Sequence, residues 1–311
     1  LFVLSEGDLP DWVQVWQPTE EKADILFLST HPDDELIFFG GAIPTYAVEQ
    51  QRKVVVAYFT RSNTTRSSEL LNGLWHMGVR TYPVIGTFKD SYANNLKAAY
   101  KSAGGKGKVN EWIVGLYRQY KPEVVVTQDT NGEYGHKQHM MIADAAQNCI
   151  ALAANEDEFT ASTIAYGTWQ VKKLYLHLYP ENQITFDWTV PLKSMNGATG
   201  IELAEEAYTL HKTQASSGMS VTETGTKYDN RVFGLAFTTV GEDVRKDDFL
   251  ENIYDAPGSY DAAANNVEAT PAPTEVPAYM AHMPALNAKG FLDEGEYLYS
   301  SEDEGLWIYV S

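Results

Sequence analysis

Ala23-Asp-Ile-Leu-Phe-Leu-Ser-Thr-His-Pro-Asp-Asp-Glu35 is the stretch that decides the fold. Its first part, Ala23–Thr30, is an apolar run with the length of a buried β-strand. The polar cluster His31–Glu35 follows at the carboxyl end of that strand, which is where ligands bind in open α/β sheets. One histidine and two aspartates in this cluster provide two ligands for a divalent metal and leave one carboxylate to act as a base.

A second polar cluster contains His136 and His139, in the segment after the apolar strand Glu123–Thr127. Taken alone, an Asp pair after a strand is typical of a helix cap, and His-x-x-His is typical of a solvated helix face. The two clusters nevertheless follow separate apolar strands, and a parallel sheet brings the carboxyl ends of such strands together. Their coincidence indicates one shared site and favours a metal hydrolase.

Strands alternate with helices from about residue 21 to about residue 255. This order predicts βαβ units with right-handed crossovers, and therefore an α/β fold: a Rossmann-like three-layer αβα domain with a mainly parallel sheet. Besides the two strands above, we predict a buried strand over 53–59 and a half-buried, alternating strand over 171–179. The apolar spacing predicts helices over 66–77, 109–120, 138–152 and 201–211.

The segments that flank this domain differ from it in composition. Residues 1–20 are predicted to form a strand and an extended arm, the end of a preceding module. Residues 256–282 are rich in Pro, Ala and Thr, as linkers are, and residues 283–311 are expected to be a β-strand segment that starts a further module. This organisation predicts additional modules in the full-length chain and an extracellular or cell-surface location.

Composition limits the classes of partner. The net charge of −19 argues against nucleic acid and against an anionic membrane surface, both of which attract Lys- and Arg-rich proteins. No run approaches the ~20 apolar residues that span a bilayer, so membrane insertion is not expected. A single cysteine, Cys149, excludes an internal disulfide, and its Ala-rich apolar surroundings predict that it packs in the core.

The chain resembles the GlcNAc-phosphatidylinositol de-N-acetylase family, also called PIG-L or LmbE-like, over roughly residues 22–215. Three motifs carry the resemblance: His31-Pro-Asp-Asp-Glu35, Arg66-Ser-Ser-Glu-Leu-Leu-Asn-Gly-Leu-Trp-His-Met-Gly-Val79 and Asn131-Gly-Glu-Tyr-Gly-His-Lys-Gln-His139. It implies a Rossmann-like fold and a zinc-dependent amide hydrolase that removes acetyl from N-acetylglucosamine-type sugars or glycoconjugates. Another divalent metal would also suit a site of two histidines and an aspartate.

The resemblance also implies a role for particular residues. By motif position, His31, Asp34 and His139 are the metal ligands, Asp33 is the general base, and His136 stabilises the oxyanion or protonates the leaving amine. The positions on the substrate side are Arg66, Asp90 and Tyr134. Three protein ligands leave a zinc position open for water, which is the pattern of a catalytic rather than a structural site.

The third motif departs from the family. The family often has Gly-His-Pro-Asp-His, whereas Lys137 and Gln138 stand between the two histidines here. A carboxylate at position 138 would favour the charged form of a nearby His136, and a glutamine cannot, so we expect residue 138 to alter the protonation of His136 unless it faces solvent.

Two other functions remain open from the sequence. The first is a non-catalytic carbohydrate-binding module that contains a metal, and the second is an amidase that acts on a thiol or peptide conjugate.

Overall fold

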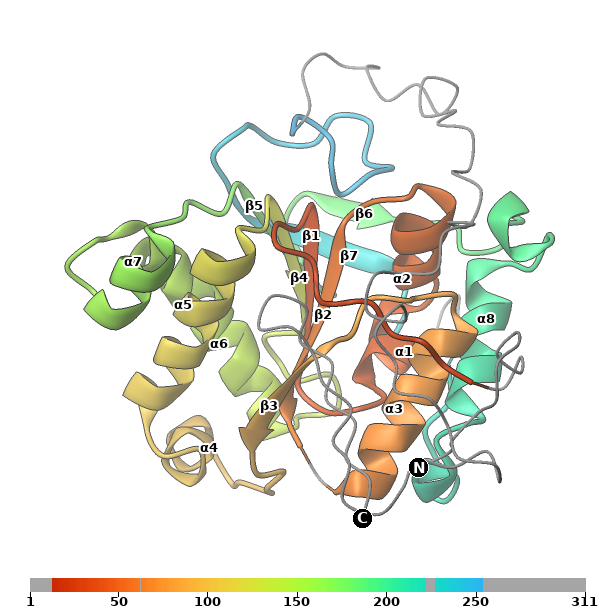
Figure 1. The fold of residues 1–311 in the computed structure, drawn as a ribbon, viewed down its shortest axis with the longest axis horizontal. Helices are drawn as coiled ribbons and strands as arrows, with labels where there is room; N and C mark the ends of the chain where they lie inside the picture. The colour runs from red at the N-terminus through yellow and green to blue at the C-terminus, as the bar shows by residue number, and fades with distance from the viewer. Residues whose placement is uncertain (1–12, 62, 222–226, 254–311) are drawn as a thin grey trace, which may run out of the picture. The chain divides into compact units, whose positions relative to one another are not determined.

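One seven-stranded sheet organises the computed structural model, which describes residues 13–61, 63–221 and 227–253. Its strand order is β3-β2-β1-β4-β5-β7-β6 (Figure 1). The strands are β1 (Ile25–Ser29), β2 (Val54–Thr60), β3 (Val84–Phe88), β4 (Val124–Thr127), β5 (Lys173–His177), β6 (Gln183–Thr185) and β7 (Val232–Thr238). Strands β1 to β5 pair in parallel, and β7 pairs antiparallel with both β5 and β6.

Helices cover both faces of the sheet (Figure 1). One layer contains α4 (Leu96–Ser102), α5 (Lys106–Tyr120), α6 (Lys137–Ala154) and α7 (Thr160–Tyr166), and the other contains α1 (Asp34–Phe39), α2 (Ala42–Pro44), α3 (Thr64–His76) and α8 (Gly200–Tyr208). The π-helical turn η1 (Thr45–Glu49) and the 3-10 turns η2 (Lys193–Met195) and η3 (Lys212–Gln214) complete the elements. The predicted three-layer αβα fold with a mainly parallel sheet is confirmed.

The direction of strand order reverses at β1, which lies between β2 and β4. The crossover from β1 to β2 runs through α1 and η1 on one face, while the crossover from β4 to β5 runs through α6 on the other. In open α/β sheets, ligands bind at such a reversal of strand order, outside the carboxyl ends of the strands. The fold therefore provides a binding position beyond Ser29 and Thr127.

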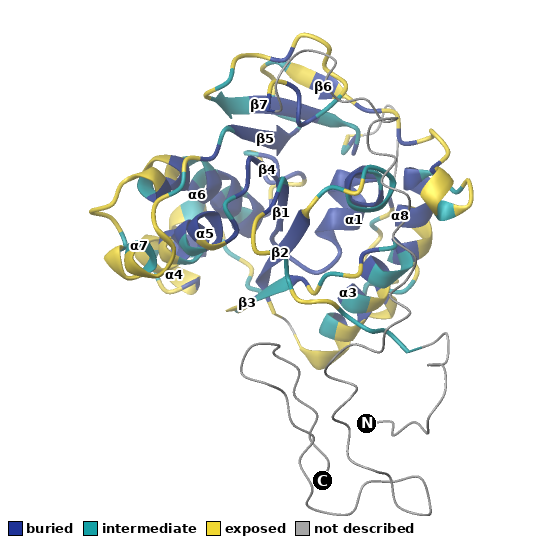
Figure 2. Ribbon diagram, turned by 45° about the horizontal axis from the view of Figure 1, so that its top comes forward, coloured by how far each residue is buried: buried dark blue, intermediate teal, exposed yellow. Residues whose placement is uncertain are grey.

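The interior is formed by apolar strand residues and by the inward faces of the helices. Figure 2 shows the central strands as buried and the outer helix surfaces as exposed. Residues of β1, β2, β4 and β5 pack against α5 and α6 in one apolar cluster, which includes Cys149. This agrees with the packing role predicted for that cysteine.

The predicted helices over 66–77 and 201–211 correspond to α3 and α8, which begin two residues and one residue earlier. The residues that cap these helices explain where they begin. Helix α3 begins at Thr64 because the Asn63 side chain accepts a hydrogen bond from the Arg66 backbone N–H. Helix α8 begins at Gly200 through a capping box of Thr199 and Glu202.

The prediction that residues 171–179 form a half-buried strand was wrong about burial. All residues of β5 are buried, including Lys173 and His177, because β5 lies between β4 and β7. Lys173 pairs with Asp243 at 2.5 Å, so its charge is compensated inside the protein. The polar residues of this strand alternate with the apolar ones, but they meet buried partners instead of water.

Contacts divide the chain into two units, one of residues 19–259 and one of residues 1–18 together with 260–311. All the helices and strands named above belong to the first unit. In the second, the described residues are 13–18, where the Trp16 indole N–H donates to Gln14 Oε1 at 3.3 Å. The strand predicted near residue 1, the linker over 256–282 and the β segment over 283–311 lie outside the described residues, so these predictions stay predictions.

Candidate active site

The predicted site residues meet beyond the carboxyl ends of the parallel strands. Each of β1 to β4 delivers part of the site from the loop or helix that follows it. The contributions are His31, Asp33 and Asp34 after β1, Arg66 after β2, Asp90 after β3, and Tyr134, His136 and His139 after β4. The sheet thus assembles residues that are more than a hundred positions apart in the sequence.

Three donor atoms converge at the centre of the site. Asp34 Oδ2 lies 3.2 Å from His31 Nδ1 and 3.3 Å from His139 Nε2. The two imidazole nitrogens are 3.0 Å apart. For ligands about 2.0 Å from a zinc ion, the edges of a tetrahedron are roughly 3.3 Å long. The three atoms are therefore spaced as the ligands of one small cation would be, and this donor set fits a divalent metal.

The charges in this centre depend on one another. Burial favours the neutral form of Asp34, but His139 and His31 outweigh it and hold the pKa of Asp34 well below its usual value. Burial also opposes a charge on His139, yet Asp34 and Glu133 raise its pKa to about 10. The carboxylates of Asp34 and Glu133 thus favour a positive charge at this position.

A third histidine, His136, completes a buried cluster with His31 and His139. The potential ligand atoms of the three residues lie within 4.8 Å of one another. The His136 ring is 4.8 Å from that of His31 and 4.7 Å from that of His139. Burial, followed by the proximity of His139 and His31, lowers the pKa of His136 to about 4. His136 is therefore uncharged at neutral pH.

Asp33 is held from two sides. Its backbone has φ 127° and ψ −24°, a conformation that residues other than glycine rarely adopt. The Asp33 N–H donates to Glu35 Oε2 at 3.0 Å, and Arg66 Nη2 donates to Asp33 Oδ1 at 3.0 Å. Burial and the neighbouring Asp34 raise the pKa of Asp33 to about 7, although Arg66 acts in the opposite direction. A carboxylate with such a pKa is suited to exchange protons near neutral pH.

Two buried groups that the sequence did not reveal support the metal-ligand candidates. Glu133 Oε2 lies 2.6 Å from His139 Nδ1, and Glu133 Oε1 lies 3.3 Å from His177 Nδ1. Gln128 Nε2 donates to Asp34 Oδ2 at 2.8 Å. Partners of this kind orient metal ligands and select the histidine tautomer. Glu133 stands inside the third motif, so its position was visible in the sequence, but its role was not.

A tight turn brings the residues of the third motif together. The Gly132 N–H donates to Asp129 O at 2.8 Å, and Gly132 O accepts from the His136 N–H at 2.9 Å. Gly132 has φ 69°, and a Cβ at this position would lie 2.3 Å from His136 O. Only glycine fits here, because any side chain would collide with the backbone that carries His136.

Gln138 does not have the position that the sequence suggested. Its side chain is fully buried, and its Oε1 lies 3.1 Å from Nε2 of His31 rather than against His136. The alternative that residue 138 faces solvent is therefore excluded, while the expectation that it alters the protonation of His136 stays a prediction. The histidine that Gln138 contacts is His31, because residue 138 lies in the first turn of α6 and its Oε1 points toward the loop after β1.

The predicted substrate-side residues lie around the centre at different depths. Arg66 is 9% exposed, and besides Asp33 its Nη1 is 3.7 Å from Asp90 Oδ2. The Tyr134 ring is 43% exposed and lies 5.7 Å from the His136 ring. Tyr92, which sequence reasoning missed, is 88% exposed with its ring 5.3 Å from His136. Exposed tyrosines thus border a buried polar centre.

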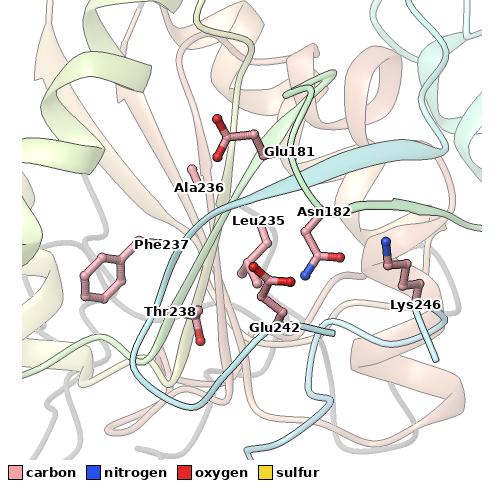
Figure 3. Close-up of a pocket in the computed structure, with 8 residues that line it drawn as sticks. All are labelled: Glu181, Asn182, Leu235, Ala236, Phe237, Thr238, Glu242 and Lys246. Carbon is pink, nitrogen blue, oxygen red and sulfur yellow. The ribbon is translucent and has the colours of Figure 1, made fainter. Parts of the chain in front are cut away.

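A separate pocket lies at the antiparallel edge of the sheet (Figure 3). It has a volume of about 340 Å³ and is lined by residues of β7 and of the segments around Glu181, Glu242 and Lys246. None of its lining residues is a histidine or belongs to the site described above. Its carboxylates and single lysine do not form a reactive group.

Residues 26–150 match the family model PIG-L, described as GlcNAc-PI de-N-acetylase. This stretch is therefore a PIG-L family domain, and the family resemblance predicted from the motifs is confirmed. Every predicted site residue, from His31 to His139, lies inside the matched stretch.

The chain is also similar to curated proteins. It is 29% identical over 180 residues to 1D-myo-inositol 2-acetamido-2-deoxy-alpha-D-glucopyranoside deacetylase 1 from Frankia casuarinae, covering 49% of this chain and 57% of that protein. It is 26% identical over 240 residues to the protein of the same name from Catenulispora acidiphila, covering 68% and 73%. The chain thus spans little more than half of the first relative.

Among solved structures, N,N'-diacetylchitobiose deacetylase from Pyrococcus horikoshii is similar with a TM-score of 0.47 and 17% identity, covering 62% of this chain and 71% of that chain. No helix among the described residues is both long and apolar enough to span a membrane.

Proposed function

We propose that this PIG-L domain is a metal-dependent amide hydrolase that removes acetyl from N-acetylglucosamine-type sugars or glycoconjugates. The observation that carries the proposal is the convergence of His31 Nδ1, Asp34 Oδ2 and His139 Nε2 beside the Asp33 carboxylate. Asp33 follows His31 by two residues and adjoins Asp34, so the proposed base is close in the chain to two of the three proposed ligands. A purely structural metal site has no use for such a base.

The metal that we propose is zinc, and another divalent ion would suit the same donors. His31, Asp34 and His139 would hold it. When bound by three protein ligands, zinc acidifies water and polarises a carbonyl oxygen, which favours attack on an amide at neutral pH.

Asp33 is proposed to accept the proton of the attacking water. Arg66 occupies its Oδ1, so Oδ2 is the oxygen that would take the proton. The same carboxyl would then return the proton to the amide nitrogen, because an amine leaves readily only once it is protonated. Arg66 Nη2 also donates a hydrogen bond to Pro32 O at 2.5 Å. This second bond holds the guanidinium in place, so that Arg66 orients Asp33 in both steps.

His136 is proposed to act without a charge. Its ring stands beside the donor cluster, and its Nδ1 is buried with no partner among the described residues. A neutral imidazole still has one N–H, which can donate a hydrogen bond to the oxygen on which negative charge develops. His136 would thus stabilise the transition state rather than supply a proton.

We infer the substrate class from chemistry and from relatives. The two curated relatives are named as deacetylases of a 2-acetamido-2-deoxyglucopyranoside, which is an acetylated amino sugar. Asp90 and Arg66 offer hydrogen bonds to sugar hydroxyls, and the exposed rings of Tyr134 and Tyr92 offer apolar faces to a pyranose ring. We propose that the reacting group is the acetamido group of such a sugar.

Release of acetate tests this function. The purified chain would be incubated with N-acetylglucosamine, N-acetylated glucosides and chito-oligosaccharides, with and without a chelator. We expect acetate from at least one sugar, loss of release with chelator, and recovery when zinc is restored.

Other outcomes identify the alternatives. Saccharide binding without acetate from any substrate would indicate a binding module. Cleavage limited to N-acylated thiols or peptides would indicate an amidase of another class.

A further inference from the structure

The Gln138 side chain links two parts of the active site. Its Oε1 lies 3.1 Å from His31 Nε2 and accepts a hydrogen bond from the Ser91 N–H at 3.0 Å. Its Nε2 donates to Lys89 O at 3.0 Å. The side chain is fully buried, so its contacts lie inside the protein. One amide thus connects a metal-ligand candidate after β1 with the loop after β3.

The backbone partners determine the orientation of this amide. A backbone N–H can only donate, so the atom facing Ser91 must be the amide oxygen, and a carbonyl can only accept, so the atom facing Lys89 must be the amide nitrogen. The oxygen near His31 Nε2 therefore accepts, and His31 carries its hydrogen on Nε2. His31 Nδ1 is then left with a lone pair toward Asp34 Oδ2 and His139 Nε2.

The same amide positions Asp90. Lys89 and Ser91 flank this residue, and both of their backbone groups bond to Gln138. Asp90 Oδ1 lies 3.5 Å from His31 Nε2. The next residue after Ser91 is Tyr92, whose exposed ring lies against His136. Gln138 thus contacts this loop on both sides of Asp90.

We infer that Gln138 is a positioning residue that sets the tautomer of His31 and fastens the loop Lys89–Tyr92 over the active site. Its kinetic consequence rests on the function proposed above, whereas its effect on the loop does not. A glutamate of equal length would keep the acceptor but turn an oxygen toward Lys89 O, so only an amide satisfies all three partners. This position thus requires glutamine for a reason that is unrelated to the charge of His136.

Hydrogen exchange and kinetics of Gln138→Met and Gln138→Glu test the inference. Methionine has a similar length but no hydrogen bonds to these partners. We expect the Ser91 amide of Gln138→Met to exchange at least ten times faster than that of the parent. With an N-acetylated sugar, both variants are expected to raise KM severalfold or more, and Gln138→Glu is expected to lower kcat by a smaller factor. Gln147→Met is the matched control, because Gln147 lies on the same helix and donates to Ala143 O.

The outcomes separate the inference from the proposed function. Unchanged Ser91 exchange in Gln138→Met, or KM values equal to that of the parent in both variants, would overturn it. If Gln138→Met does not fold, the KM of Gln138→Glu decides. If the parent releases no acetate, the proposed function fails, while the exchange of Ser91 still tests whether Gln138 fastens the loop.

Discussion

Glu133 Oε2 lies 2.6 Å from Nδ1 of His139, and both side chains are completely buried. Burial alone would raise the pKa of Glu133, but His139 and His177 outweigh it and lower that pKa, so the carboxylate stays charged. A charged acceptor on Nδ1 fixes the His139 ring and leaves Nε2 directed at Asp34.

Replacing this carboxylate should weaken the metal site. Glu133→Gln is expected to lower the affinity for zinc by about 10- to 100-fold, because the proposed ligand His139 loses its charged partner. Competition with a chromophoric chelator measures the affinity. Glu123→Gln is the control, since Glu123 is buried and ion-paired with Lys22 and Lys172 but belongs to no part of the site. Equal affinities in the two variants would exclude an orienting role for Glu133.

The ligand candidates themselves can be tested by metal content. We expect about one divalent ion per parent chain and strongly reduced amounts in His31→Ala and His139→Ala, since each removes one of three ligands. Elemental analysis after dialysis gives the stoichiometry. His76→Ala should retain the metal, because His76 pairs with Glu206 at the surface. Full occupancy in both site variants would refute the assignment.

Asp33→Asn should separate metal binding from hydrolysis. The amide has nearly the same shape but cannot accept a proton from water, so we expect kcat to fall on the order of 10²-fold or more at unchanged metal content. Asp90→Asn, on the substrate side, is expected to act mainly on KM. Rates of acetate release against substrate concentration distinguish the two effects. An Asp33→Asn variant with parental kcat would remove this residue as the base.

His211 is expected to make stability depend on pH. It is buried, and neither ring nitrogen has a hydrogen-bond partner among the described residues. Burial and Arg66 lower its pKa to about 4, although Glu69 acts in the opposite direction. Because the unfolded chain binds this proton near pH 6.5, the contribution of His211 to stability is complete above that pH and declines as the pH falls toward 4.

The variant His211→Phe isolates this effect. Between pH 7 and pH 5, the free energy of unfolding of the parent should fall by about 2 kcal/mol more than that of His211→Phe. Urea denaturation at the two pH values provides the measurement. The same comparison with His76→Phe should give a much smaller difference. Parallel changes in the parent and His211→Phe would mean that His211 is not buried in its neutral form.

The sequence predicted the central sheet and the motifs better than it predicted the edges. Strands β1, β2 and β4 are continuous apolar runs, which is typical of parallel strands covered on both faces. Strand β3 is less buried and contains a glycine, and β6 has only three residues, so neither carries a clear pattern. Strand β7 was missed although it contains an apolar stretch, since its pairing with β5 and β6 depends on distant residues.

Within the site, local motifs pointed to the candidate residues that the sheet brings together, but not to the buried groups that contact them. His31, Asp34 and His139 are recognisable as ligand candidates because metal sites require particular side chains at particular places. Gln128, Glu133 and His177 act through hydrogen bonds across the sheet, and such contacts have no fixed spacing in sequence. Gln138 is the clearest example. It stands between two histidines in the sequence, yet its side chain contacts His31, which precedes it by more than a hundred residues.

The positive φ of Asp33 implies that folding stability and the proposed catalytic role place opposite demands on this residue. A non-glycine residue in such a conformation costs about 1–3 kcal/mol, and this residue is also a buried acid. Asp33→Gly would relieve both penalties, so laboratory selection for heat resistance alone would favour it, although it removes the base that the proposed function requires. If the proposed function holds, thermostable descendants of this chain are therefore best obtained by screening for acetate release in the same round.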